Sequence, residues 1–354
     1  DQSMKSAIFK RAAALLLALV ICLTAFPGFG ITAHAATDVT DEIFMIAFPR
    51  EGDSAYDDDW GHGALSFKNG WHTAKSRYTN IRAIGSYSSQ ICYCIEPGVS
   101  QNTGDEFTQK GENFWDNYPS DYNDVLSPDE IKLFIGRIFQ YGYTGNISLN
   151  WRSQNSADAD KLSHAIATQL LIWETMVGER DADFNKIDPG SYDAVLGYLN
   201  EKHPLRDQVM SHYNSMVSSV KKHTKLPSFM SKSTGKAQTV ELAWNGSEYT
   251  ATLTDSNEVL SGYTFSSKDT GLKFSVSGNK LTITSPTAPT DKVSITAEKT
   301  KSQRKGVVVW TDGVYGPEGE LQDVVTFAET VSDPVKGYLN VKVSVGSLKI
   351  IKES

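Results

Sequence analysis

The chain contains 354 residues, with 42 acidic and 34 basic side chains and a formal net charge of −8 at pH 7. This acidic balance argues against a nucleic-acid-binding protein, because phosphate recognition depends on a cationic surface. The length predicts two domains, and three cysteines are too few for a fold stabilised by a network of disulfides.

The N-terminus has the pattern of a secretory signal. A basic segment at residues 5–11 precedes an apolar run at residues 12–26, and an Ala-His-Ala cleavage sequence follows at residues 33–35. We therefore expect residues 1–35 to be a signal peptide and leader, and the mature protein to be exported. The leader holds three cations and one anion, so its removal would leave a net charge of −10. No later apolar stretch has the length of a bilayer span, so no membrane insertion is expected in the mature region.

From Asp41 onward the sequence predicts strands and turns before any helix. The run Ile43–Phe48 is a candidate buried strand, and residues 64–94 contain short β-prone runs separated by Asn-Gly and serine-rich turns. Cys92 and Cys94 end this segment. On an extended strand their Cα atoms would lie about 6.5–7 Å apart, at the limit for a disulfide, so we expect two thiols.

Helices are predicted in the middle of the chain. The segment Ser127–Glu130 combines an N-cap serine, a proline at the first helical position and a capping-box glutamate, and it predicts a helix that fades by Gly142. A second helix is expected from residues 155–156 to about Val177. Its apolar residues recur every three to four positions, and Gln169 lies in register with them.

The hydrophobic period changes near residue 230. Two further helices are expected before that point, at residues 188–200 and after Pro204. Residues 226–235 are rich in Ser, Lys and Pro and predict a linker, whereas later runs alternate at period two between turn signals, which is typical of a β-sandwich. We therefore predict an α+β domain, with a β-sheet and a helical subdomain, at residues 36–230. An all-β immunoglobulin-like sandwich is expected at residues 236–345, and the start of a further domain at residues 346–354.

Cys94 and Gln169 are the candidate reactive pair. A carboxamide on the buried face of a helix must find a hydrogen-bond partner or bear a desolvation cost. A buried thiol beside it could attack the carboxamide carbon, expel ammonia and leave an internal thioester. The residues alone leave a second interpretation open, in which Cys94 is a structural buried thiol.

Two segments carry a family resemblance. Tyr93–Gly98 (YCIEPG) and Thr168–Trp173 (TQLLIW) resemble the motif pair of the thioester domains of Gram-positive surface adhesins and pilus-tip proteins. The resemblance covers about residues 37–229 and implies that Cys94 is the thioester cysteine and Gln169 its acyl donor. Leu170 departs from the pattern, because many members carry a small residue after the glutamine. The tail at residues 346–350 resembles the first strand of a Cna-B-type stalk domain.

The resemblance implies a secreted, cell-wall-anchored adhesin that reacts with a lysine or other amine of a host or extracellular-matrix protein to give a covalent isopeptide attachment. Such a protein reacts once, so no enzymatic turnover and no cofactor are expected. Two other functions stay open: a non-covalent binding or stalk module with a structural cysteine, and a Cys–His hydrolase that uses Cys94 and His164. The intact mass distinguishes them, because only the thioester form lacks one ammonia.

Neighbours in sequence define the expected environment of the reactive pair. This environment consists of Tyr93, Ile95, Thr168, Ile172 and Trp173, whose apolar members would exclude water from the bond. His164 and Glu174 lie five residues on either side of Gln169 and are candidates for the base that takes a proton from the incoming amine. At about 100° per residue this offset points both away from Gln169, so a structural role is the alternative.

No metal site is expected. His62 and His72 lack the spacing of metal ligands, and the acidic run at residues 57–59 lacks the spacing of an EF-hand. Solvated loops are the expected setting for all of them.

Overall fold

The computed structural model describes residues 40–48, 64–65, 74–75, 79–84, 91–97, 106–118, 123–145, 155–191, 194–199, 201–299, 301–311 and 323–343. The chain divides into two compact units, Asp1–Val39 and Thr40–Ser354, and the described residues belong to the second. The predicted leader, the acidic run, His62, His72 and the tail at residues 346–354 lie outside the described residues. Within the described part, no helix combines the length and the apolar character needed to cross a membrane.

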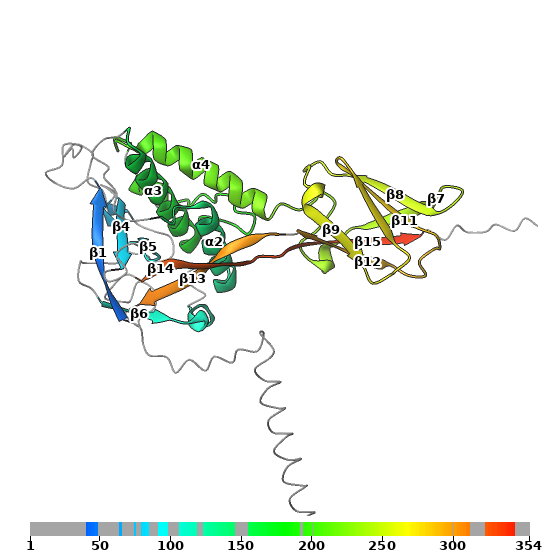
Figure 1. The fold of residues 1–354 in the computed structure, drawn as a ribbon, viewed down its shortest axis with the longest axis horizontal. Coiled ribbons are helices and arrows are strands. Elements are labelled where there is room, and N and C mark those ends of the chain that lie inside the picture. Colours follow the sequence, from blue (N-terminus) through cyan, green and yellow to red (C-terminus); the bar gives the residue numbers. More distant parts are fainter. Residues whose placement is uncertain are drawn as a thin grey trace, which may run out of the picture. The chain divides into compact units, whose positions relative to one another are not determined.

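Six antiparallel strands form a closed barrel (Figure 1). Around the barrel their order is β1 (Thr40–Phe48), β4 (Thr79–Ile84), β5 (Ile91–Cys94), β14 (Val324–Ser332), β13 (Gln303–Thr311) and β6 (Glu106–Lys110). A separate two-stranded sheet consists of β2 (Ala64–Leu65) and β3 (Ala74–Lys75). The strand predicted at residues 43–48 is confirmed as part of β1.

The hairpin of β13 and β14 belongs to the barrel, although the β-rich region surrounds it in sequence. Val324 of β14 pairs with Cys94 of β5, and Trp310 of β13 pairs with Gln109 of β6. This corrects the expectation that all of residues 236–345 form one sandwich. Alternating hydrophobicity identifies a strand but not the sheet that it joins, because pairing depends on side-chain packing between distant segments.

The three long helices lie where the sequence predicts them. They are α2 (Pro128–Tyr141), α3 (Ala157–Met176) and α4 (Arg206–His223). Ser127 and Glu130 form the predicted capping box at the start of α2, and the Ser156 side chain caps α3 by accepting from the Ala159 amide. Short 3-10 turns are η2 (Glu112–Asn117), η4 (Val195–Tyr198), η5 (Thr234–Lys236) and η6 (Leu260–Gly262).

The prediction of a helix at residues 188–200 is wrong. Among the described residues of this segment, the structure forms only the short turn η4. Gly190 has a left-handed φ of 73°, which favours glycine, and Pro189 before it has no amide hydrogen for a helical bond. The chain therefore turns where the sequence pattern suggested a helix.

One hydrophobic cluster fills the space between the barrel and the helices. Every residue of α3 from Ala165 to Met176 is buried. A helix buried on all sides packs against neighbours all round, and α3 contacts β5, α2 and α4. Gln169 therefore lies in the interior of the domain.

A seven-stranded sheet forms the β-rich region. Its order is β10 (Lys273–Ser277), β11 (Lys280–Ser285), β8 (Tyr249–Thr254), β7 (Thr239–Trp244), β15 (Val335–Val343), β12 (Val293–Lys299) and β9 (Tyr263–Ser267). Strand β7 pairs parallel with β15 and antiparallel with β8, so it joins two halves of the sheet. Side chains from both halves, including Leu281 and Ile295, share one core. The predicted fold class, an α+β domain followed by an all-β region, is confirmed.

The segment expected to be a linker is packed rather than free. Leu226 and Phe229 are buried, and Ser231 exchanges two backbone hydrogen bonds with Tyr338 of β15. The Ser/Lys/Pro-rich composition predicted a flexible connection, but its few apolar residues are enough to anchor it.

Candidate functional site

The carboxamide of Gln169 pairs with the backbone of Cys94. The amide N–H of Cys94 donates to Gln169 Oε1 at 2.8 Å, and Gln169 Nε2 donates to the Cys94 carbonyl at 2.8 Å. Both residues are fully buried. The two bonds satisfy the buried carboxamide and hold its carbon beside the residue that carries the thiol.

Cys94 is the last residue of β5, where the strand lies between two neighbours. Arg82 of β4 pairs with Cys92, and Val324 of β14 pairs with Cys94. One residue later, the Ile95 amide donates to the Asp323 carbonyl at 3.0 Å. The ladder on both sides fixes the backbone of Cys94, so the thiol projects from a rigid element.

A hydrogen-bonded brace joins the residues that precede Cys94 and Gln169. The Tyr93 hydroxyl donates to the Tyr143 carbonyl at 2.5 Å, and the Tyr143 amide donates to Thr168 Oγ1 at 3.0 Å. Burial raises the pKa of Tyr93 well above its usual value, so its hydroxyl stays protonated and remains a donor. Through the backbone of Tyr143, β5 and α3 are tied together next to the reactive pair.

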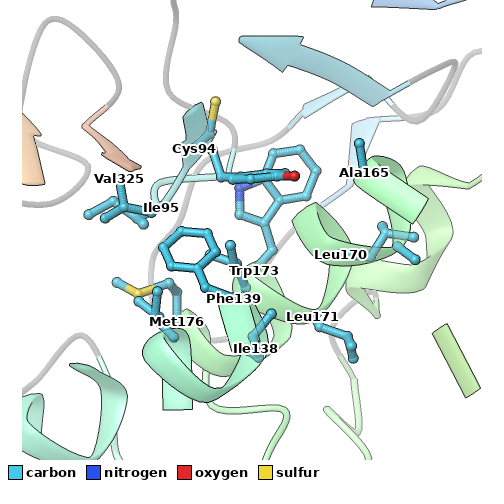
Figure 2. Close-up of a cluster of buried hydrophobic side chains, with 14 of the residues drawn as sticks. Cys94, Ile95, Ile138, Phe139, Ala165, Leu170, Leu171, Trp173, Met176 and Val325 are labelled. Carbon is cyan, nitrogen blue, oxygen red and sulfur yellow. The ribbon is translucent and has the colours of Figure 1, made fainter. Parts of the chain in front are cut away.

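Apolar side chains surround Cys94. Ile95 and Ile172 are fully buried, and Trp173 is 4% exposed. Figure 2 shows Cys94 in this cluster, with its sulfur directed away from Phe139. The Trp173 ring packs on Tyr198 with centroids 4.5 Å apart. Because Cys94 is fully buried, its thiol is shielded from solvent.

Glu174 is held in an ion-pair network. Its carboxylate accepts from Arg180 Nε at 2.8 Å, from Lys186 Nζ at 3.0 Å and from the Tyr213 hydroxyl at 2.7 Å. The Arg180 guanidinium also donates to the Tyr213 hydroxyl. These contacts give Glu174 the structural role that was the alternative to a base.

His164 is likewise engaged in packing. Its Nε2 atom lies 2.9 Å from the Tyr141 carbonyl oxygen, and its ring stacks on His212 with centroids 4.5 Å apart. Burial lowers the pKa of His164, so the ring is neutral at pH 7 and Nε2 acts as the donor to the carbonyl. These contacts favour the structural interpretation of His164 as well.

Two buried carboxylates near Cys94 were not recognised from the sequence. Glu96 and Asp323 are both fully buried, and the Asp323 amide donates to Glu96 Oε2 at 2.8 Å across 227 positions of sequence. Glu96 lies within the YCIEPG motif, but the motif does not indicate which group binds its carboxylate. Asp323 follows from no local pattern, because only the closure of the barrel brings it there.

Within the described residues, no group of three His, Cys, Asp or Glu side chains is arranged to hold a metal ion. A nucleophilic sulfur and an acyl carbon lie on adjacent elements in a buried, apolar setting, and such a pair can exchange an amide for a thioester.

Part of the chain is similar to a known protein family. A family model described as "Thioester domain" matches residues 91–222. No curated protein matches the chain.

Several solved structures are similar at low sequence identity. The thioester domain of the Staphylococcus aureus TIE protein is 18% identical over 86% of this chain and 99% of that chain, with a TM-score of 0.36. The Bacillus anthracis TIE protein is 14% identical over 86% of this chain and 49% of that chain, with a TM-score of 0.32. The Cys426Ala mutant of the pilus-presented adhesin Spy0125 (Cpa) is 13% identical over 87% of this chain and 80% of that chain, with a TM-score of 0.26.

Proposed function

We propose that this protein is a secreted surface adhesin whose Cys94 and Gln169 form an internal thioester, and the match of residues 91–222 to the family model described as "Thioester domain" supports this proposal. The bond captures a lysine amine of a host or extracellular-matrix protein, and the product is a covalent isopeptide attachment. The protein acts once and does not turn over. The signal peptide predicted at residues 1–35 supports a location outside the cell, and attachment to the cell wall is part of the proposal.

The paired hydrogen bonds between Gln169 and the Cys94 backbone are the observation that carries this proposal. They restrain the acyl carbon and the thiol to one neighbourhood before any reaction. Holding two reactants in a productive geometry can lower a barrier by about 7–11 kcal/mol. No external enzyme is then needed for the bond to form during folding.

Bond formation proceeds by exchange at the Gln169 carboxamide. The Cys94 sulfur attacks Cδ as the thiolate, the C–Nε2 bond breaks, and ammonia leaves with the proton from the thiol. In the second step the neutral amine of a lysine attacks the same carbon, and Cys94 leaves as a thiol. A free lysine has a pKa of about 10.4 and is mostly protonated at pH 7, so capture should quicken as pH rises.

Intact mass spectrometry tests the bond. Purified protein should weigh one ammonia less than its sequence, and Cys94→Ala and Gln169→Ala should each restore the full mass. Cys92→Ala is the matched control, because Cys92 is a second buried thiol on the same strand and its removal should leave the deficit unchanged. Full mass in the unmodified protein, freshly purified and unhydrolysed, would contradict the proposal and favour the non-covalent binding or stalk module.

Methylamine provides a second test. It should add to Gln169, cancel the mass deficit and release one thiol for titration. With a protein target, the unmodified chain should give an adduct that survives boiling in detergent, whereas Cys94→Ala should not. An adduct that forms without Cys94 would mean that another group makes the attachment.

A further inference from the structure

A basic groove of about 950 Å³ lies beside the C-terminal end of α4, and neither Cys94 nor Gln169 lines it. One wall follows a single stripe of α4 that includes Asn214, Ser218 and Lys221. The other walls come from residues 224–236 and from the turn that contains Asp183 and Asn185. The groove is therefore separate from the proposed thioester.

Cations dominate the lining of the basic groove. Its lysines are Lys221, Lys222, Lys225, Lys232 and Lys236, all exposed. Asp183 is the one carboxylate in its described lining, and it pairs with Lys232. Like charges gathered in a concave surface focus the field and attract anions. In a chain with a net charge of −8, such a concentration of lysines is a local exception.

The helix dipole explains only part of this arrangement. Lysines at the end of a helix are stabilised by the partial negative charge of the exposed carbonyls, and this accounts for Lys221 and Lys222. Lys232 and Lys236 lie beyond the end of α4 at His223, on a segment that has turned back to face the groove. The dipole gives no reason for their position.

The wall formed by residues 225–231 is fixed before any ligand binds. The Tyr263 hydroxyl donates to the Lys225 carbonyl at 2.7 Å, and Asn257 Nδ2 donates to the Leu226 carbonyl at 2.9 Å. The Ser228 amide donates to Asp255 Oδ1 at 2.7 Å. A preformed surface loses little conformational entropy on binding, which favours affinity.

The uncharged lining indicates the class of ligand. Amide and hydroxyl groups share the lining with apolar side chains, of which Val217 and Met230 are half-buried and Leu226 and Pro227 are buried. Among the residues that the structure describes, no aromatic side chain lines the groove, so this part of it lacks the stacking surface that favours sugar rings. Apolar side chains between carboxylates, as in an acidic peptide, match both parts of the lining.

We infer that the basic groove binds an acidic peptide segment of a partner protein, reversibly and without involving the thioester. Lysine ammonium groups pair with its carboxylates, and the apolar surface takes the side chains between them. The chain would then have two binding activities, one covalent and one reversible. Because the groove contains no residue of the reactive pair, either activity can fail without the other.

Fluorescence anisotropy with a labelled peptide of about twelve residues, rich in Glu and containing Leu, tests this inference on the full mature chain. The triple variant Lys222→Glu, Lys225→Glu and Lys236→Glu should weaken binding by about tenfold or more. Raising the ionic strength from about 0.05 to about 0.5 M should weaken binding to the unmodified chain to a similar degree, because salt screens exposed charges. Asp183→Asn removes the one carboxylate and should tighten binding by about twofold.

Two further triple variants separate the groove from net charge and from folding. Lys268→Glu, Lys273→Glu and Lys280→Glu make the same charge change on exposed lysines of the β-rich region and should leave affinity within about twofold. Acidic residues weaken the end of a helix, so glutamine at positions 222, 225 and 236 provides a milder test and should still weaken binding. Equal loss in the control triple, or no loss in the glutamine triple, would overturn the inference. So would tighter binding of a heparin-derived oligosaccharide through the same lysines, which would reassign the groove to sulfated glycans.

Discussion

The two regions of the described chain treat buried polar groups differently. In the α+β region, fully buried polar side chains bond to partners that are distant in sequence, as Gln169 does to Cys94 and Glu174 does to Tyr213. In the β-rich region the buried members of the shared core are mainly aliphatic, with Leu281 and Ile283 fully buried. Its fully buried Asp255 accepts from backbone amides, including those of Val259 and Ser228.

The buried polar contacts of the α+β region specify one geometry, whereas the apolar core of the β-rich region mainly contributes to stability. A polar group in a core is satisfied only if its partners are placed correctly, so a network of such groups specifies a single arrangement. Aliphatic cores tolerate exchange when volume is kept. The α+β region should therefore be sensitive to single polar substitutions, and the β-rich region to loss of volume.

The largest effect is expected at Glu174. Glu174→Gln would leave the guanidinium of Arg180, which is 3% exposed, without its counter-charge, and breaking a buried pair from one side costs about 3–5 kcal/mol. Urea denaturation should report this loss. Glu298→Gln is the control, because its pair with Lys336 at 3.8 Å is half exposed and should contribute below about 1 kcal/mol. Equal costs for both variants would remove the contrast between the two regions.

Loss of volume should act in the other region. Leu281→Ala leaves a cavity in the aliphatic core, and such truncations cost about 2–5 kcal/mol. Val276→Ala is the control on the neighbouring strand, where the side chain is 41% exposed. Mass spectrometry should show the ammonia deficit unchanged in Leu281→Ala. A lost deficit would mean that the β-rich core directs the geometry of the reactive pair.

Glu179 should make the stability of the α+β region depend on pH. Burial raises the pKa of this carboxyl from 4.5 to about 7, although it accepts a hydrogen bond from the Val195 amide. The folded state therefore binds the proton more tightly than the unfolded state, and stability should fall as pH rises from about 4.5 to about 7, by at most about 3 kcal/mol. Glu179→Gln keeps the acceptor and removes the charge, so its stability should vary less over that range. A pH dependence identical to that of the unmodified chain would assign the fall to other groups.

The smallest effect on stability is expected at the brace. Tyr93→Phe removes the donor to the Tyr143 carbonyl and should cost about 1 kcal/mol. Because the brace positions β5 against α3, the ammonia deficit should also develop more slowly after refolding, as followed by mass spectrometry over time. Tyr249→Phe, in β8 of the β-rich region, should alter neither quantity. If the deficit develops at the same rate in Tyr93→Phe, the brace serves stability alone.

Local sequence patterns predicted the helices. The site, in contrast, depends on the pairing of strands that are distant in sequence and close the barrel. The capping box at Ser127 and the helical period around Gln169 act within a few residues, so α2 and α3 were predicted well. The brace through Tyr143 uses a backbone carbonyl and amide, which no side-chain pattern can reveal. Asp323 and the β13–β14 hairpin reach the barrel only through pairing with β5 and β6. The helix predicted at residues 188–200 is wrong for a local reason, because Pro189 and Gly190 favour a turn although the hydrophobic pattern indicated a helix.

The place of β14 in the barrel has a consequence for biogenesis. During synthesis and export, Cys94 emerges long before Val324, its partner on β14, and the sheet at β5 stays open until that strand arrives. Contacts between residues so distant in sequence slow folding, because the intervening chain must first be brought together. The acyl chemistry proposed for Cys94 therefore follows the synthesis of β14 and its pairing with β5.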